Sequence, residues 1–216
     1  MQPIGSADSV KNLVHRTEEI AMNSPQLAPA DRLPAGLAKL LSSKLPPLGP
    51  GEPQAAFAAG LESADPAVWC GSGSPDSPAA ACCAAGLWLW NGFLDRSHEI
   101  SQEIDTAEGS WWHGIMHRRE PDPGNAAYWF RRVGRHPLFG SLADAMQRLA
   151  AGRGRSLPAA ASWLATVDRW DPFRFIDFCE TARCSGDSSL QAFAQEAAAV
   201  EWYELFHHCQ QQAADS

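Results

Sequence analysis

Proline is distributed so unevenly along this chain that it limits where helices can form. Ten of the 16 prolines lie between residues 23 and 78. Proline lacks a backbone N–H and its ring clashes with the preceding helical turn, so helix interiors exclude it. Residues 6–22 carry apolar side chains at helical spacing and predict one amphipathic helix. For the rest of the segment 1–78 we expect a mostly irregular arm with one or two short helices and a surface loop at 71–78.

The sequence after residue 78 has helical periodicity, and alternating strand patterns are nearly absent. We therefore expect the fold class to be all-α, with a single helical domain over residues 79–216. Its first helix, at 79–104, is apolar nearly all round at its start, which predicts a long, central and buried helix. The remaining helices are expected at 106–119, 125–134, 138–151, 158–167, 172–184 and 188–213.

The composition excludes two classes of partner. A formal net charge of −8 argues against nucleic-acid binding, because that function needs a basic face to neutralise phosphates. No apolar run approaches the roughly 20 residues that cross a bilayer. The N-terminus also lacks the apolar segment of a secretion signal. We therefore expect a cytoplasmic protein without a membrane partner, whose six cysteines are free thiols.

Residues 87–139 concentrate the side chains that build ligand sites. Five of the nine tryptophans, four of the seven histidines and six arginines lie in this stretch. Aromatic side chains beside imidazole, guanidinium and carboxylate groups are typical of a small-molecule or metal pocket. This stretch therefore predicts where a functional site lies, and the sequence does not identify the ligand or the reaction.

Three histidines in this stretch have the spacing of a divalent metal site. His113 and His117 are four residues apart, so they project from one face of a helix. The turn that follows the preceding helix brings His98 back toward them as a third ligand, and zinc or iron are the expected metals. Glu99 and Glu120 lie near these histidines on the two helices. The candidate acid and base groups are therefore Glu99, Glu120, His113 and His117.

The comparison with known metal motifs is only partial. The sequence HGIMH has Gly114 where a zinc protease of the HExxH type has its catalytic glutamate, which argues against that chemistry. Asp95 lies three residues before His98, whereas di-iron bundles carry Glu-x-x-His on two helices. Three interpretations stay open: metal ligands, acid–base histidines without a metal, and core histidines whose hydrogen bonds are simply satisfied.

Two pairs of adjacent arginines follow the histidines and allow a site for a small anionic ligand. Guanidinium groups bind carboxylates and phosphates in a bidentate manner. The same arginines also lie near helix C-termini, where the macrodipole favours cations in a purely structural role. Helical periodicity assigns Arg132 to the pocket face and Arg131 to another partner. The candidate ligand-binding residues are Arg118, Arg119, Asn125, Tyr128, Trp129, Arg131, Arg132 and Trp112.

The block from Trp112 to Pro137 resembles the signature WHxxMHRRExDxxNAxYWFRRVGxHP of an uncharacterised protein family found in bacteria and fungi. The segments FIDFCETA and EWYELFHHC are similar to that family as well, so the resemblance extends from about residue 80 to the C-terminus. The matching positions are Trp112, His113, Met116, His117, Arg118, Arg119, Glu120, Asp122, Asn125, Ala126, 128–134, His136 and Pro137. The resemblance implies a grouping and carries no activity with it.

A weaker similarity links the same helices to a tetratricopeptide or Sel1-like helix hairpin. Gly114, Ala126, Phe130 and Pro137 lie near the positions of that motif, but Ser110 stands where its tryptophan is expected. No second copy follows, although such repeats need about three copies to bury a core. The leading hypothesis is therefore an α-helical protein that binds a small anionic ligand, either as an enzyme or without catalysis. The alternative is a non-enzymatic, tetratricopeptide-like interaction module.

Overall fold

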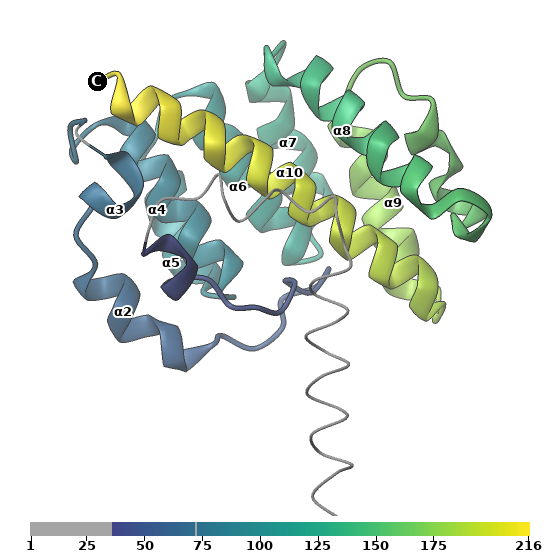
Figure 1. Ribbon diagram of the computed structural model, residues 1–216, viewed down its shortest axis with the longest axis horizontal. Helices are drawn as coiled ribbons and strands as arrows, with labels where there is room; N and C mark the ends of the chain where they lie inside the picture. The colour runs from purple at the N-terminus through teal and green to yellow at the C-terminus, as the bar shows by residue number, and fades with distance from the viewer. Residues whose placement is uncertain (1–35, 72) are drawn as a thin grey trace, which may run out of the picture.

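The computed structural model describes residues 36–71 and 73–216, and the helix expected at 6–22 lies outside these ranges. Within them every regular element is a helix, so the all-α prediction is confirmed (Figure 1). The α-helices are α2 (Ala58–Ser63), α3 (Ala67–Cys70), α4 (Pro78–Trp90), α5 (Leu94–Ser101), α6 (Ala107–Arg119), α7 (Pro123–Val133), α8 (Leu138–Arg153), α9 (Pro172–Cys184) and α10 (Ser188–Ala214). The 3-10 helices are η2 (Leu37–Lys39), η3 (Ala55–Phe57), η4 (Gly154–Ser156) and η5 (Ala159–Ala165).

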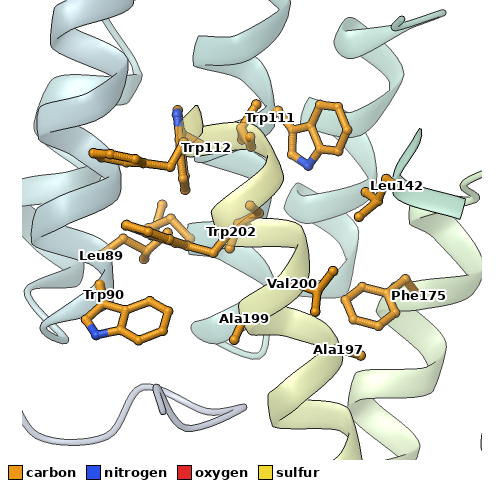
Figure 2. Close-up of a cluster of buried hydrophobic side chains, with 14 of the residues drawn as sticks. Leu89, Trp90, Trp111, Trp112, Leu142, Phe175, Ala197, Ala199, Val200 and Trp202 are labelled. Carbon is orange, nitrogen blue, oxygen red and sulfur yellow. The ribbon is translucent and has the colours of Figure 1, made fainter. Parts of the chain in front are cut away.

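The C-terminal helix α10 runs across the whole bundle and packs against α3, α4, α8 and α9 (Figure 1). Aromatic side chains fill the space on both sides of it, with Trp202 and Trp112 on one side and Phe175 on the other (Figure 2). Trp202 packs on Trp112 with ring centroids 5.9 Å apart. One continuous apolar core therefore joins the first and last helices of the bundle.

The described part of the proline-rich arm belongs to this core. Leu37, Leu48 and Trp69 are buried in the same cluster as the side chains of α4 and α10. The arm contains four short helices, η2, η3, α2 and α3, rather than the one or two expected. Prolines lie between η2 and η3 and between α2 and α3, where each removes a donor that a longer helix would need.

The single helix expected at 79–104 is wrong, because the chain breaks between α4 and α5. Gly92 has φ 82°, a left-handed conformation that glycine adopts without a steric penalty. The buried side chain of Asn91 donates to the carbonyls of Leu40 and Leu87, at 2.8 and 2.9 Å. Its Oδ1 accepts from the Ser42 backbone N–H at 3.2 Å. Asn91 therefore ends α4 and holds the arm against it at the same time.

Other helix boundaries follow from capping side chains. Thr106 accepts a hydrogen bond from the Gly109 N–H at 3.1 Å and so caps the start of α6. The Asp122 carboxylate caps α7, which therefore begins at Pro123, two residues before the predicted start. The helix expected at 158–167 is the 3-10 helix η5 rather than an α-helix.

Two further properties concern the whole described region. No helix in residues 36–71 or 73–216 combines the length and hydropathy that a membrane crossing requires. All six cysteines carry free thiols, and five of them are buried. Burial raises the pKa of the Cys179 thiol to about 12, which keeps it protonated and unreactive at neutral pH.

We predict that Asn91→Ala destabilises the fold by about 2–3 kcal/mol, because it leaves the buried Leu40 carbonyl and the Ser42 N–H without their partner. Urea unfolding followed by far-ultraviolet circular dichroism measures this change. Asn125→Ala is the matched control, since Asn125 is exposed and its side chain contacts only Asp122. An equal effect of both substitutions would contradict the assignment of Asn91 as the link between arm and bundle.

Candidate metal centre

Three histidines from two helices meet at one place in the structure. His98 lies on α5, and His113 and His117 lie one turn apart on α6. One ring nitrogen from each lies within 4.8 Å of the others. The ring centroids of His113 and His117 are 4.8 Å apart, and His98 is 4.6 and 5.4 Å from them. The expected chain reversal therefore places the three imidazoles in a single cluster.

The turn between α5 and α6 is tight because of Gly109. A Cβ at this position would lie 2.4 Å from the Ile104 carbonyl oxygen, which is closer than atoms can approach. On the α7 side of α6, Gly114 has a similar role. Because it lacks a side chain, the Phe130 ring of α7 can pack directly against α6. Glycines at these two positions therefore allow α5 and α7 to pack closely on both sides of the histidines.

The hydrogen-bond partners of the histidines determine which ring nitrogen carries the proton. His117 Nδ1 lies 2.9 Å from the Glu120 carboxylate, which only accepts hydrogen bonds, so Nδ1 is the donor. The Ser101 hydroxyl donates to the His98 carbonyl oxygen at 3.4 Å. Its oxygen can then accept from His113 Nδ1, at 3.3 Å. In that arrangement both rings carry the proton on Nδ1 and have an unprotonated Nε2; in the other arrangement the hydroxyl donates to His113 Nδ1 and His113 Nε2–H donates to His117 Nε2.

These two Nε2 atoms face each other at 3.0 Å. Two nitrogen lone pairs at this distance repel each other unless a cation lies between or beside them. Burial, with the nearby His117 and His98, lowers the pKa of His113 to about 3, so His113 is a neutral imidazole at neutral pH. With the proton of each ring on Nδ1, a metal ion bound by both Nε2 atoms removes the repulsion between them.

The other residues around the histidines place the cluster at the border between the core and solvent. The Trp129 ring stacks on His113, with centroids 3.9 Å apart and an interplanar angle of 26°. His98 and Trp129 are half-buried, whereas His113 and His117 are buried. The Arg132 guanidinium lies over Trp129, 5.2 Å from the ring centroid, and pairs with Asp105 at 3.0 Å. One side of the cluster is therefore enclosed and the His98 side is open.

Several predicted site residues lie near the cluster without contacting the histidines. Tyr128 is 49 % exposed and packs edge-on against Trp129. The Asn125 side chain bonds to Asp122 at the start of α7, and Arg131 is exposed. Glu99 pairs with Arg96 at 2.6 Å on the exposed face of α5. Of the two predicted acid–base carboxylates, Glu120 contacts a histidine and Glu99 does not.

The remaining predicted residues point into the core, away from the histidines. Trp112 packs against Trp202 of α10. Arg118 forms a buried ion pair with Glu201 of α10. Arg119 donates to the carbonyls of Leu89 and Pro50. The structure therefore does not gather the four predicted arginines at one place, because consecutive helical residues diverge by about 100°.

A second histidine cluster was not recognised in the sequence. Glu108 Oε1 lies 3.2 Å from the Nε2 atoms of both His136 and His208, and 3.3 Å from Gln212 Nε2. The three donors come from positions 28, 100 and 104 residues away. Because each of these residues is separated so far from Glu108 along the chain, no local spacing signals the cluster.

The hydrogen bonds of this second cluster do not favour a metal. His136 Nδ1 accepts from the Leu138 backbone N–H at 3.2 Å, so His136 is protonated at Nε2 and donates to Glu108. A ligand nitrogen must be unprotonated to bind a metal. The carboxylate thus holds the loop after α7 against α10, and the hydrogen bonds from His136 and His208 lower the pKa of Glu108.

No family model, curated protein or solved structure matches the chain. The resemblance of residues 112–137 to a bacterial and fungal family therefore stays an expectation.

We predict that Glu108→Gln lowers stability at pH 7 and weakens its dependence on acid. The folded state holds the pKa of this carboxyl below the ordinary 4.5, so its stabilisation is present above that pH and is lost as the pH falls further. Urea unfolding at pH 7 and at acid pH measures both effects. Glu99→Gln, at an exposed ion pair, is the control. Parallel pH profiles for wild type and Glu108→Gln would contradict this prediction.

Proposed function

We propose that His98, His113 and His117 bind one divalent metal ion, with zinc as the favoured metal. The observation that carries this proposal is the pair of facing Nε2 atoms 3.0 Å apart, with Glu120 and Ser101 next to the two Nδ1 atoms. In a tetrahedral zinc site with Zn–N bonds of about 2.0–2.1 Å, neighbouring nitrogens lie roughly 3.3 Å apart. A small movement of the two rings therefore suffices to place both nitrogens on one ion.

The groups behind the ligands support the same proposal. Metal-bound histidines usually donate their other ring N–H to a carboxylate, a carbonyl or a hydroxyl, which fixes the ring and its tautomer. Glu120 has this position behind His117, and Ser101 has it behind His113. His98 has a ring nitrogen within 4.8 Å of the other two ligand atoms, so rotation of this half-buried side chain completes the set.

Three protein ligands leave the fourth position of a tetrahedral metal open. Sites of this kind bind water or a substrate there, and zinc lowers the pKa of the bound water to about 7. A metal held by these histidines would be reached from the partly exposed side of the cluster, where Trp129 stacks on His113 and the Arg132 guanidinium lies over Trp129. We therefore propose a small anionic ligand at the metal and a metal-activated water as the nucleophile. Arg132 is the arginine best placed to attract that ligand.

The first test is the metal content of the purified protein. We expect about one equivalent of zinc per chain, and His113→Ala or His117→Ala should reduce it to less than about a tenth, since each removes one of three ligands. Inductively coupled plasma mass spectrometry measures this. His207→Ala is the control, because His207 lies on α10 outside both histidine clusters.

Reconstitution with Co²⁺ adds an independent measurement, since a tetrahedral cobalt site gives intense visible absorption. A wild-type protein that binds neither ion, even when zinc is added to the refolded chain, would contradict the proposal. It would leave the histidines as a proton-sharing pair and favour the interaction-module alternative.

We further predict that Glu120→Gln weakens zinc affinity by about 10–100-fold, the usual effect of removing a carboxylate behind a histidine ligand. Glutamine still accepts the hydrogen bond from His117, so the change isolates the charge. Competition with a chromophoric chelator measures the affinity. Glu99→Gln should leave it unchanged, because Glu99 pairs with Arg96 and not with a ligand. Equal affinities for Glu120→Gln and wild type would exclude Glu120 from this role.

A further inference from the structure

A small, largely apolar cavity lies between the core and the proline-rich arm, away from the three histidines. It has a volume of about 30 Å³ and is bordered by α4, α6, α9, α10 and the proline-rich arm. Trp90 and Trp202 form part of its apolar wall, and Arg118 and Arg119 supply its charged groups. Within the described chain, none of the residues lining it is an aspartate or a glutamate.

Each of the two arginines has a buried guanidinium nitrogen that no described group satisfies. Arg118 Nη2 donates to Glu201, but Arg118 Nη1 has no hydrogen-bond partner. Arg119 uses Nη1 and Nη2 to bond the carbonyls of Leu89 and Pro50, but its Nε has no partner. Arg118 is 3 % exposed and Arg119 is 6 % exposed. Two residues that line one cavity therefore each have a buried donor without an acceptor among the described residues.

The charges around the cavity are also out of balance. Glu201 neutralises Arg118, whereas the partners of Arg119 are neutral carbonyl groups. Leu89 is in the last turn of α4, where the helix macrodipole contributes roughly half a negative charge. Burial and the neighbouring Arg118 lower the pKa of Arg119 to about 10, so it stays a cation at neutral pH. A buried cation with this incomplete compensation is costly unless an anion joins it.

We propose that the cavity binds one monatomic anion, with chloride as the physiological ion, held between Arg118 and Arg119. The volume of the cavity limits which anions can bind in it. One water molecule needs about 10–15 Å³ on the same measure, so the cavity admits a halide or at most two waters. Sulfate, phosphate and larger carboxylates do not fit. The anion completes the hydrogen bonds of the two free guanidinium nitrogens and balances the charge of Arg119.

This site is independent of the metal centre, although both use α6. His117 and Arg118 are adjacent in sequence but point to different sides of the helix, toward Glu120 and toward Glu201. The halide is therefore expected in protein stripped of metal as well as in the metal-bound form. Failure of one proposal leaves the other standing.

Bromide tests the proposal directly in the wild-type protein. Crystals grown in sodium bromide should show an anomalous peak in the cavity between the two guanidinium groups. In solution, replacing sodium gluconate with sodium bromide at constant ionic strength should raise Tm by several degrees and then saturate, as expected for an ion that binds only the folded state. Gluconate is too large to enter the cavity, so it serves as the reference anion.

Arg119→Met supplies the matched variant, because it removes the charge and keeps a side chain of similar length. It should abolish the anomalous peak and the bromide-specific rise in Tm. Arg131→Gln, at an exposed arginine of α7, should retain both. Electron density for water without an anomalous signal, together with a Tm indifferent to bromide, would overturn the proposal. The wild-type measurements decide the question even if Arg119→Met does not fold.

Discussion

The architecture depends on a helix that is buried on every side and yet carries polar residues. Every residue of α6 from Gly109 to Arg119 is buried. A buried imidazole or guanidinium group is costly unless it has a hydrogen-bond partner or a counter-charge. The helices around α6 therefore have to supply those partners at fixed places. The packing of these neighbouring helices therefore depends on the partners that the polar side chains of α6 need, as well as on the burial of apolar side chains.

The polar side chains of α6 divide into two sets that face opposite parts of the bundle. Toward α5, Ser101 and Glu120 meet the histidines. Toward α9 and α10, the Glu201 carboxylate is completely buried and accepts hydrogen bonds from both Trp111 and Arg118. The Arg118 guanidinium also lies 4.6 Å from the centroid of the Phe175 ring. The contacts of Trp111 and Arg118 with Glu201 fix α6 in the core. They thereby also hold the histidines in place on the side of α6 that faces the half-buried His98.

The sequence predicts those parts of the site that depend on local spacing. The pair His113 and His117 follows from helical geometry, and the return of His98 follows from a short turn with a threonine cap at Thr106. The break after Trp90 was missed because its cause is not local. Asn91 looks like any helical residue until its partners in the arm, 49 and 51 positions away, are known.

The same reason explains why the sequence does not show the partners of the arginines. Arg118 and Arg119 are adjacent in the sequence, but Arg118 pairs with Glu201, 83 residues later. Only the packing of α10 reveals that partner. Likewise, the tautomers of the histidines depend on Ser101 and its contact with the His98 carbonyl, which no periodicity encodes. Local patterns thus identify the faces of helices, whereas protonation states and ion pairs require the tertiary contacts.

The buried polar groups on α6 differ in how completely their charges and hydrogen bonds are compensated by neighbouring residues. The Arg118–Glu201–Trp111 network has matching charges, and Glu201 uses both of its oxygens. Two other places differ: the Nε2 atoms of His113 and His117 face each other, and Arg119 has no anionic partner among the described residues. Natural sequences rarely retain buried polar groups without compensation, and exceptions concentrate at functional sites. The two places lie on different sides of one helix. The proposed metal ion at the first and the proposed halide at the second would each compensate polar groups that the described residues leave without a partner.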